Sequence, residues 1–419
     1  ERLATKKGGT MNKILGIIAE YNPFHNGHKY QLQKAKKETN SKYTIAIMGG
    51  NFTQRGSISL INKWDKAKLA LLGGIDLVIE LPLIYSISSA ENFAEGAIKL
   101  LSSLKIVDYL SFGAETSDLN TLNTISDILY SEPNDFKLLI NQALKKGLSF
   151  PKARENALVS YLNNPNISKI VSSPNNILGI EYLKALKKCN SSIKPHLVQR
   201  IGSDYNDKNI TNTFSSSTAI REAISSKNYS SLKDVIPSEC LKVLSEKIDS
   251  NEIITDLSVF EKIILYRFRM MTIEEISNLP DVSEGLEFSI KKAAFCCNNI
   301  TSFINALKSK RYTLTRLQRI FLYALLNITK EDMAMSKKTE PYVRVLGFNE
   351  NGKELLSKIS KASSNIKLVT SVKSFIDNCD DKDILYFINK DVFATNVYCL
   401  GYTFDIRGQL DYMNGIVSL

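Results

Sequence analysis

Short apolar runs alternate with amphipathic segments through the first half of the chain. The run ILGIIA within residues 12–19 has no polar side chain, as expected for a strand buried on both faces of a parallel sheet. The segments between such runs carry apolar residues three and four positions apart, which is typical of helices. We therefore expect strands at 12–19, 43–48, 75–80, 108–112 and 196–199, and helices at 27–37, 63–72, 89–104, 119–130, 136–146, 152–162, 176–188 and 217–225.

This alternation predicts an α/β fold with a doubly wound parallel sheet and right-handed crossovers. From about residue 230 the pattern changes to amphipathic helices with little strand between them, followed by one expected strand at 342–348. We therefore expect a catalytic domain over residues 11–230 and a mainly helical region over 231–419 with a small α/β part at its end. The expected helices of the second region cover residues 241–248, 259–270, 289–297, 314–326, 354–359 and 382–400.

Charge and cysteine usage narrow the classes of protein that fit. The formal charge is +11, and it is +9 without residues 1–10, which we interpret as the remnant of an expression tag because Met11 opens the first strand. This surplus suits a polyanionic partner such as RNA, although a well-solvated, lysine-rich surface explains it equally well. Six scattered cysteines without a CxxC pair predict reduced thiols and a cytoplasmic location. No apolar run approaches the roughly 20 residues of a membrane span, and no signal peptide precedes Met11, so we expect no membrane association.

Chemically informative residues gather after the predicted strands, at 20–28, 49–55, 112–115 and 200–205. Ligands of doubly wound sheets bind beyond the carboxyl ends of the strands, so these segments are expected to share one site. Within it, His25 and His28 stand three residues apart at the start of a helix, where unpaired backbone N–H groups and the helix dipole favour an anion. The two histidines can therefore hold one phosphate group, although a capped core turn with two incidental histidines is the alternative. With no third ligand nearby they do not predict a metal site.

The strand–HxGH–helix unit resembles the nucleotidyltransferase superfamily that includes the catalytic domains of class I aminoacyl-tRNA synthetases. The longer segment GIIAEYNPFHNGH, with NFTQRG, DLVIELP, FGAE, PNNILGIEY, QRIGSDY and YVRVLGF in order behind it, resembles the bacterial tRNA(Met) cytidine acetate ligase family. The likeness extends over most of residues 11–419. It implies a Rossmann-like, ATP-binding catalytic domain over 11–230 and a tRNA-binding role for 231–419.

The resemblance also implies two-step chemistry. Acetate attacks the α-phosphate of ATP to give acetyl-adenylate and pyrophosphate, with Mg²⁺ bound through the phosphates. The N4 amine of the wobble cytidine of elongator tRNA(Met) then takes the acetyl group and releases AMP. Such chemistry needs positioning and charge stabilisation at phosphoryl oxygens and no protein nucleophile, which agrees with the absence of a recognisable Ser-His-Asp or Cys-His set.

The resemblance assigns catalytic roles to His25 and His28 and ATP contacts to a longer set of residues. Ser216, Ser217 and Thr218 begin a helix, where hydroxyls can contact phosphates from the opposite side, although an ordinary N-cap is the alternative. An adenine or ribose contact and a helix cap both remain open for Asn175. The expected ATP-binding set is Ile17, Ile18, Ala19, Glu20, Tyr21, Asn22, Pro23, Phe24, His25, Asn26, Gly27, His28, Lys29, Tyr30, Gly113, Asn175, Arg200, Ser216, Ser217 and Thr218.

Two further segments are candidates for contact with tRNA. Arg55 lies in the polar, glycine-containing loop 49–56, which suits a substrate-facing element or an ordinary surface loop. Lys63 and Lys66 flank the only tryptophan, Trp64, a mixture that suits phosphate contact with base stacking. A tryptophan packed in the core beneath a solvated basic face is the alternative.

Two other functions stay open at this point. A small-molecule adenylyltransferase of cofactor synthesis would use the same nucleotide site, but it leaves the roughly 190 residues after 230 without a role. A non-catalytic RNA-binding protein on a nucleotide-binding scaffold is the third reading, against which the intact histidine pair argues. The general base for the cytidine amine, the basis of acetate selectivity and the oligomeric state are not determined by the sequence.

Overall fold

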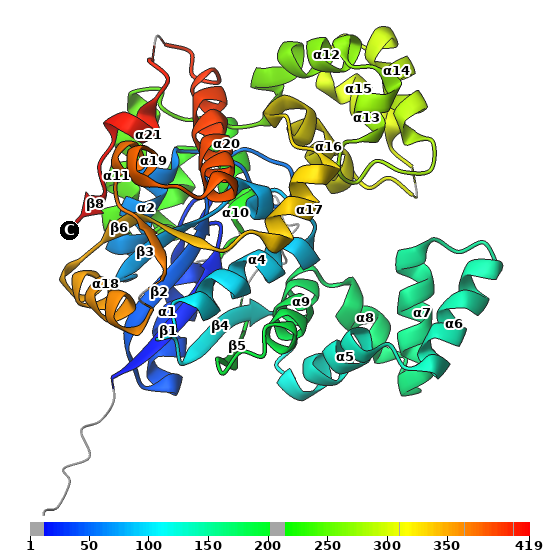
Figure 1. Ribbon diagram of the computed structural model, residues 1–419, viewed down its shortest axis with the longest axis horizontal. Coiled ribbons are helices and arrows are strands. Elements are labelled where there is room, and N and C mark those ends of the chain that lie inside the picture. Colours follow the sequence, from blue (N-terminus) through cyan, green and yellow to red (C-terminus); the bar gives the residue numbers. More distant parts are fainter. Residues whose placement is uncertain (1–11, 202–213, 310, 364, 405) are drawn as a thin grey trace, which may run out of the picture.

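A twisted central sheet forms the middle of the molecule, and helices cover both of its faces (Figure 1). The computed structural model describes residues 12–201 and 214–419 apart from 310, 364 and 405. The expected tag remnant at 1–10 and the end of the QRIGSDY block at 202–205 lie outside the described residues. The first strand, Lys13–Ala19, is buried over almost its whole length, as its apolar run predicts.

The sheet has the order β5-β4-β1-β2-β3-β6-β7, with β8 paired to β6. Neighbouring strands from β5 to β3 are parallel, which confirms the predicted α/β class and doubly wound arrangement. The carboxyl ends of β1, β2, β4 and β5 therefore meet at one edge. The strands are β1 (Lys13–Ala19), β2 (Ser41–Gly49), β3 (Leu77–Leu81), β4 (Tyr109–Ala114), β5 (Lys194–Gln199), β6 (Tyr342–Phe348), β7 (Lys367–Val369) and β8 (Val417–Ser418).

Strand β6, which the sequence predicts at 342–348, lies in the same sheet as the strands of the first half. It pairs antiparallel with β3, with Ile79 opposite Val345 and Glu80 opposite Arg344. The sheet is therefore mixed, and the last part of the chain completes the sheet that the first part begins. The physical reason is burial, because nearly every residue of β6 is buried, and an isolated small α/β unit would leave much of that apolar surface in water.

The helices of the first half surround the sheet, and most of them match the expected segments. Helix α2 has the predicted bounds, whereas α1 begins one residue earlier than predicted because His25 caps it. They are α1 (Asn26–Thr39), α2 (Lys63–Leu72), α3 (Leu83–Ser86), α4 (Ala90–Ser103), α5 (Leu119–Ser131), α6 (Asn134–Lys145), α7 (Phe150–Leu162), α8 (Asn166–Ser172), α9 (Pro174–Lys188) and α10 (Ser217–Ser225).

The second half is mainly helical, as expected, and part of it projects from the sheet as a separate lobe formed by α12–α16 (Figure 1). Phe303 and Phe321 stack inside that lobe, and the Phe268 ring packs edge-on against both. The elements are η1 (Tyr229–Asp234), α11 (Ser238–Asp249), η2 (Leu257–Phe260), α12 (Glu261–Met270), α13 (Ile273–Ser277), α14 (Leu286–Cys296), α15 (Ile300–Leu307), α16 (Leu314–Leu326), α17 (Lys330–Lys338), α18 (Glu350–Ala362), α19 (Val372–Asn378), α20 (Lys382–Cys399) and α21 (Leu410–Met413).

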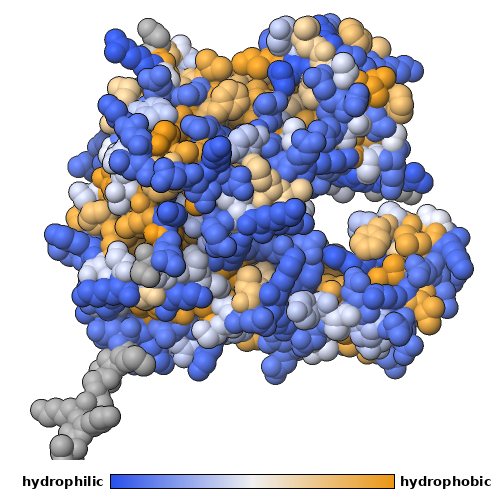
Figure 2. All heavy atoms as spheres, viewed as in Figure 1, coloured by the Kyte–Doolittle hydropathy of each residue, from blue (hydrophilic) through white to orange (hydrophobic). Residues whose placement is uncertain are grey.

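A notch in the surface separates the α12–α16 lobe from the lobe that contains α6 and α7 (Figures 1 and 2). Helix α9 packs against α4 and α5, and α16 lies at the edge of the α12–α16 lobe nearest to α20 (Figure 1). No helix among the described residues is long and apolar enough to cross a membrane.

Candidate active site

Hydrogen bonds to distant segments hold the turn after β1 in place. The Asn22 side chain donates to the carbonyl of Ile58 and accepts the backbone N–H of Leu60 at 2.7 Å. Arg221 on α10 donates to the Asn22 carbonyl at 2.7 Å. The turn is thus tied to two segments far away in sequence, which holds the beginning of α1 in place.

His25 and His28 cap the beginning of α1 reciprocally. Nδ1 of His25 accepts the backbone N–H of Gly27 at 3.0 Å, and Nδ1 of His28 accepts the backbone N–H of His25 at 3.3 Å. Their rings stack with centroids 3.7 Å apart. Because both Nδ1 atoms accept, each neutral ring carries its proton on Nε2. The capping arrangement therefore leaves two Nε2–H donors for a ligand.

Both imidazoles are held in the neutral form. Burial, aided by the nearby charges of Arg200 and Arg221, lowers the pKa of His25 to about 3. Burial, then the His25 ring and Arg200, also holds the pKa of His28 well below its ordinary value. The positive charge at this site is therefore carried by the two arginines, and the histidines contribute directed hydrogen-bond donors.

Gly27 lies so close to the His25 ring that a larger residue would not fit without moving the ring. A Cβ added at Gly27 would lie 2.9 Å from Cε1 and 3.1 Å from Nδ1 of His25. The absence of a side chain at Gly27 therefore leaves space for the His25 ring.

A cavity of about 430 Å³ opens where the strand ends meet, and both histidines line it. It brings together residues from the β1, β2, β4 and β5 ends, as the topology predicts. The predicted residues that line it are Ile18, Ala19, Glu20, Tyr21, Asn22, His25, His28, Arg55, Gly113, Asn175, Arg200, Ser217 and Thr218.

The remaining predicted residues lie outside the lining of this cavity. Gly27 and Tyr30 line a small adjoining cavity beside Arg200. Ile17 and Phe24 are buried in the core, where Phe24 packs beneath α1. Asn26 donates its side-chain amide to the Asp234 carbonyl, which ties α1 to the segment before α11. Pro23 and Lys29 belong to the same turn and helix without lining the main cavity.

Asn175 is positioned by Glu115. One oxygen of the Glu115 carboxylate accepts the Asn175 side chain at 2.7 Å, and the other accepts the Asn176 backbone N–H at 2.9 Å. The Asn176 side chain accepts the backbone N–H groups of Glu115 and Thr116 in return. This reciprocal clamp joins the end of β4 to the beginning of α9 and brings Asn175 to the cavity wall.

The hydroxyl residues at the beginning of α10 divide into two roles. Ser216 is buried and caps the helix by accepting the backbone N–H of Ala219 at 3.1 Å, so the N-cap alternative is correct for this residue. Ser217 and Thr218 line the cavity. Arg221, one turn further, contacts the Thr218 hydroxyl at 3.3 Å and also lines the cavity.

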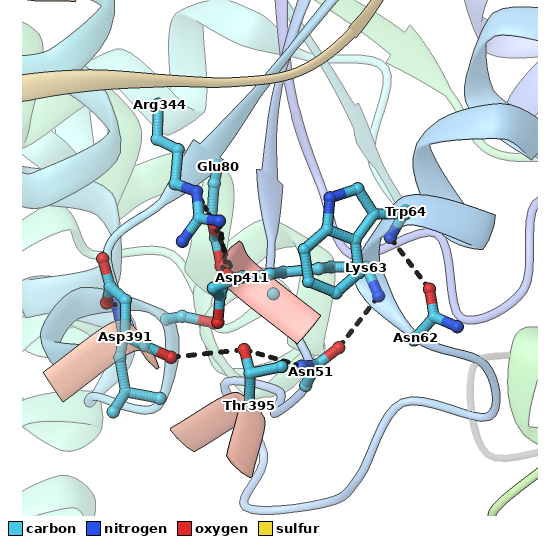
Figure 3. A network of polar contacts seen from close by, with 12 residues as sticks. Asn51, Asn62, Lys63, Trp64, Glu80, Arg344, Asp391, Thr395 and Asp411 are labelled. Atoms are coloured by element: carbon cyan, nitrogen blue, oxygen red, sulfur yellow. Dashed lines mark hydrogen bonds and ion pairs between the residues drawn. The ribbon is translucent and has the colours of Figure 1, made fainter. Parts of the chain in front are cut away.

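The structure corrects the predicted tRNA contacts of α2. Lys63 and Lys66 are fully buried and Trp64 is buried in the C-terminal part of the core (Figure 3). Lys63 pairs with Glu80 at 3.0 Å and with Asp411 at 2.7 Å. Lys66 donates to the carbonyl groups of Gly49 and Gly50, and burial lowers its pKa to about 8. These residues fasten the loop after β2 and cannot reach RNA at the surface.

Sequence reasoning missed a wall of the cavity that comes from distant segments. Gln31, Phe93, Leu178 and Tyr182 complete its sheet side. Leu314, Thr315 and Gln318 reach it from α16, about 300 residues after the first strand. Local patterns give no signal for these residues, because the helix periodicity of 314–326 predicts only which positions are apolar.

Comparison with known proteins places this site in a family. A model of the HIGH nucleotidyl transferase family matches residues 12–411. The tRNA(Met) cytidine acetate ligase of Thermoanaerobacter sp. (strain X514) is 44% identical over 406 residues, which are 97% of this chain and all of the relative. That of Halothermothrix orenii is 40% identical over 97% of this chain.

Solved structures agree with the sequence comparison. The crystal structure of apo Thermotoga maritima TmcAL is 33% identical with a TM-score of 0.93, and it covers 97% of this chain and 99% of its own. A second crystal structure of the same protein, bound with alpha-thio ATP, has a TM-score of 0.90 at the same identity. From its HxGH turn, its mixed sheet and these likenesses over nearly its whole length, the chain belongs to the tRNA(Met) cytidine acetate ligase family of the HIGH nucleotidyl transferases.

Proposed function

We propose that this chain activates acetate with ATP and transfers the acetyl group to N4 of the wobble cytidine of elongator tRNA(Met). The observation that carries the proposal is the pair of Nε2–H donors that His25 and His28 present to a cavity also lined by Arg200 and Arg221. Family membership over nearly the whole chain supports the same activity.

In the first step an acetate oxygen attacks the α-phosphorus of ATP. The new O–P bond gives acetyl-adenylate, and the bond to the β,γ-phosphates breaks to release pyrophosphate. The His25 and His28 donors would hold the phosphoryl oxygens, on which negative charge is spread in the transition state. Arg200, Arg221, Ser217 and Thr218 would bind the leaving phosphates. Mg²⁺, bound through the phosphates, would neutralise part of their charge.

In the second step the cytidine N4 attacks the acetyl carbonyl carbon. A C–N bond forms, the bond between that carbon and the AMP oxygen breaks, and N4 loses one proton to solvent. The products are N4-acetylcytidine and AMP. Gly113, Asn175 and the turn at 17–30 would keep the nucleotide in place between the two steps, so that the adenylate does not need to leave the cavity.

The partners follow from this chemistry. The formal charge of +9 without residues 1–10 would favour association with the tRNA backbone, and Arg55, which lines the cavity, would contact a phosphate of the anticodon loop. The helices of residues 231–419 would supply further backbone contacts. All six cysteines are free thiols, which suits the reducing cytoplasm in which tRNA is found.

The test uses ATP, carbon-labelled acetate and a tRNA(Met) transcript. The proposal expects acetate-dependent exchange of labelled pyrophosphate into ATP without RNA, and label on N4 of cytidine when the transcript is added. Consumption of ATP only with a phosphorylated metabolite would instead indicate a small-molecule adenylyltransferase. ATP left unchanged in every mixture would indicate a non-catalytic protein.

A further inference from the structure

The cavity has two chemically different ends, which the strand order separates. His25 and His28 follow β1, in the middle of the sheet edge, and Gly113 and Arg200 follow β4 and β5 on one side. The loop after β2 lies on the opposite side and contributes Thr53, Gln54, Arg55 and Ser57. A nucleotide bound across β1, β4 and β5 with its phosphates at the histidines therefore leaves the β2 side for the group that accepts the acetyl.

Helix α16 closes the cavity on this β2 side. A Cβ added at Gly56 would lie 2.4 Å from the backbone nitrogen of Arg319 and 2.6 Å from the carbonyl carbon of Gln318. The loop backbone thus touches the helix backbone, and Gly56, with a φ of +76°, is the residue that permits it. The first turns of α16 then bring Leu314, Thr315 and Gln318 to the cavity.

The helix is held firmly in this position. The Arg319 guanidinium pairs with Asp281 at 2.8 Å, and Arg316 donates to the Asp281 carbonyl. At the other side Tyr323 donates its hydroxyl to the carbonyl of Ile87 at 3.0 Å. The loop itself is fixed to the sheet edge, because the backbone N–H of Gln54 donates to the Glu20 carboxylate at 2.7 Å. Contacts within the protein therefore hold both α16 and the loop after β2 in place beside the cavity.

Gln318 brings a carboxamide, with both donors and an acceptor, to this wall of the cavity. It is half-buried, and in the part of the chain that the structure describes its carboxamide makes no hydrogen bond to protein. Leu314 lies one turn before it on the same helix face and is 40% exposed, which offers an apolar surface beside the amide. A flat base can rest on such a surface while its edge meets the amide.

We infer that Gln318, with Leu314 beneath the base, forms the subsite for the cytosine that accepts the acetyl group, an inference that rests on the proposed function. The Gln318 amide donates to N3 or O2, the acceptors of the cytosine edge, and leaves the N4 amine free to attack the adenylate. Arg55 on the adjoining loop takes the phosphate of the same nucleotide. Gln318 is therefore needed for acetyl transfer and not for acetate activation.

The experiment separates the two half-reactions in the full chain. Gln318→Glu keeps the size of the side chain and removes the donor, and Gln318→Leu removes all hydrogen bonding. The control is Gln33→Glu, at an exposed position of α1 outside the cavity lining. Pyrophosphate exchange with acetate and no RNA measures the first step, and label transfer to a saturating tRNA(Met) transcript measures the second.

The inference expects both Gln318 variants to keep exchange within about twofold and to lose transfer by about tenfold or more, the usual effect of a base-edge contact. The control keeps both activities. Unchanged transfer in the Gln318 variants would overturn the inference, and so would exchange that falls together with transfer. Absence of exchange and of transfer in the unaltered protein would overturn the proposed function itself, so the two failures are distinguishable.

Discussion

His25 and His28 stack with their ring centroids 3.7 Å apart, and each accepts a backbone N–H through Nδ1. The two side chains that cap the helix are therefore the same two that we propose as donors to the phosphates. Because the backbone N–H groups occupy both Nδ1 atoms, the proton of each neutral ring is on Nε2. Both histidines line the cavity. This relationship explains why both positions need a residue that can accept on one side and donate on the other.

Replacement of either histidine by asparagine should separate capping from catalysis. Asparagine can still accept a backbone N–H at position 25, where it is a favoured N-cap, and its amide oxygen is also an acceptor at position 28, the N3 position of the capping box. At neither position can it extend a donor as far as Nε2 does. We expect acetate-dependent pyrophosphate exchange to fall by about 100-fold or more for His25→Asn and for His28→Asn. Urea unfolding should show that each variant keeps a cooperative transition. Full exchange activity in both variants would contradict the assigned role.

The replacement Gly27→Ala should damage activity more than stability. Its Cβ would lie 2.9 Å from Cε1 of His25, so the ring must move. In a helix the same change otherwise stabilises by up to about 1 kcal/mol through lower chain entropy. We expect exchange to fall by about tenfold or more while the melting temperature stays near that of the unaltered protein. A variant that retains full activity would show that the ring has room to adjust.

Stability should decrease in mild acid because of the buried histidines. The pKa of His25 is about 3 in the folded chain, below its ordinary value of 6.5, so the unfolded chain binds more protons between these values. The free energy of unfolding is therefore unaffected by the titration of His25 above pH 6.5. As the pH falls from 6.5 toward 3, it decreases by up to about 1.4 kcal/mol per pH unit. Urea unfolding at a series of pH values measures this slope. The slope should be shallower in His25→Asn, and an identical slope would refute the assignment.

Removal of a single charge from the buried ionic network around Lys63 should destabilise the fold (Figure 3). Glu80 lies between Lys63 at 3.0 Å and Arg344 at 3.2 Å, and all three are buried. Asp411 contacts the same two cations, while burial, reinforced by Glu80, raises the pKa of Asp391 to about 7. Removal of one charge leaves buried cations uncompensated.

We therefore expect Glu80→Gln to lower the free energy of unfolding by about 3–5 kcal/mol, measured by urea denaturation. The matched control is Glu132→Gln, because Glu132 faces Lys137 at 3.9 Å with both side chains 53% exposed. That change should cost less than about 1 kcal/mol. Similar losses in the two variants would mean that burial adds nothing to the Glu80 contacts.

The sequence by itself determined the parallel part of the sheet and the position of the histidine pair at the start of α1. Continuous apolar runs predict buried strands, and the HxGH turn places two imidazoles at the start of a helix. Both features depend on interactions within a few residues of sequence. The bounds of α2 and α16 could be read from their periodicity alone. The ends of four strands also had to meet, because parallel strands with crossovers leave no other arrangement.

Only the tertiary structure decided what lies around that centre. Burial of Lys63 and Trp64 depends on α20, α21 and β6, which arrive from more than 250 residues away and supply Cys399, Leu410, Asp411 and Arg344. The α16 wall of the cavity depends on the contact between Gly56 and the helix backbone. Side-chain charge and period carry no information about such long-range contacts, since the same lysine suits a solvated surface or a buried ion pair. The fold therefore determined which basic residues line the cavity and which are buried in the network that holds the protein together.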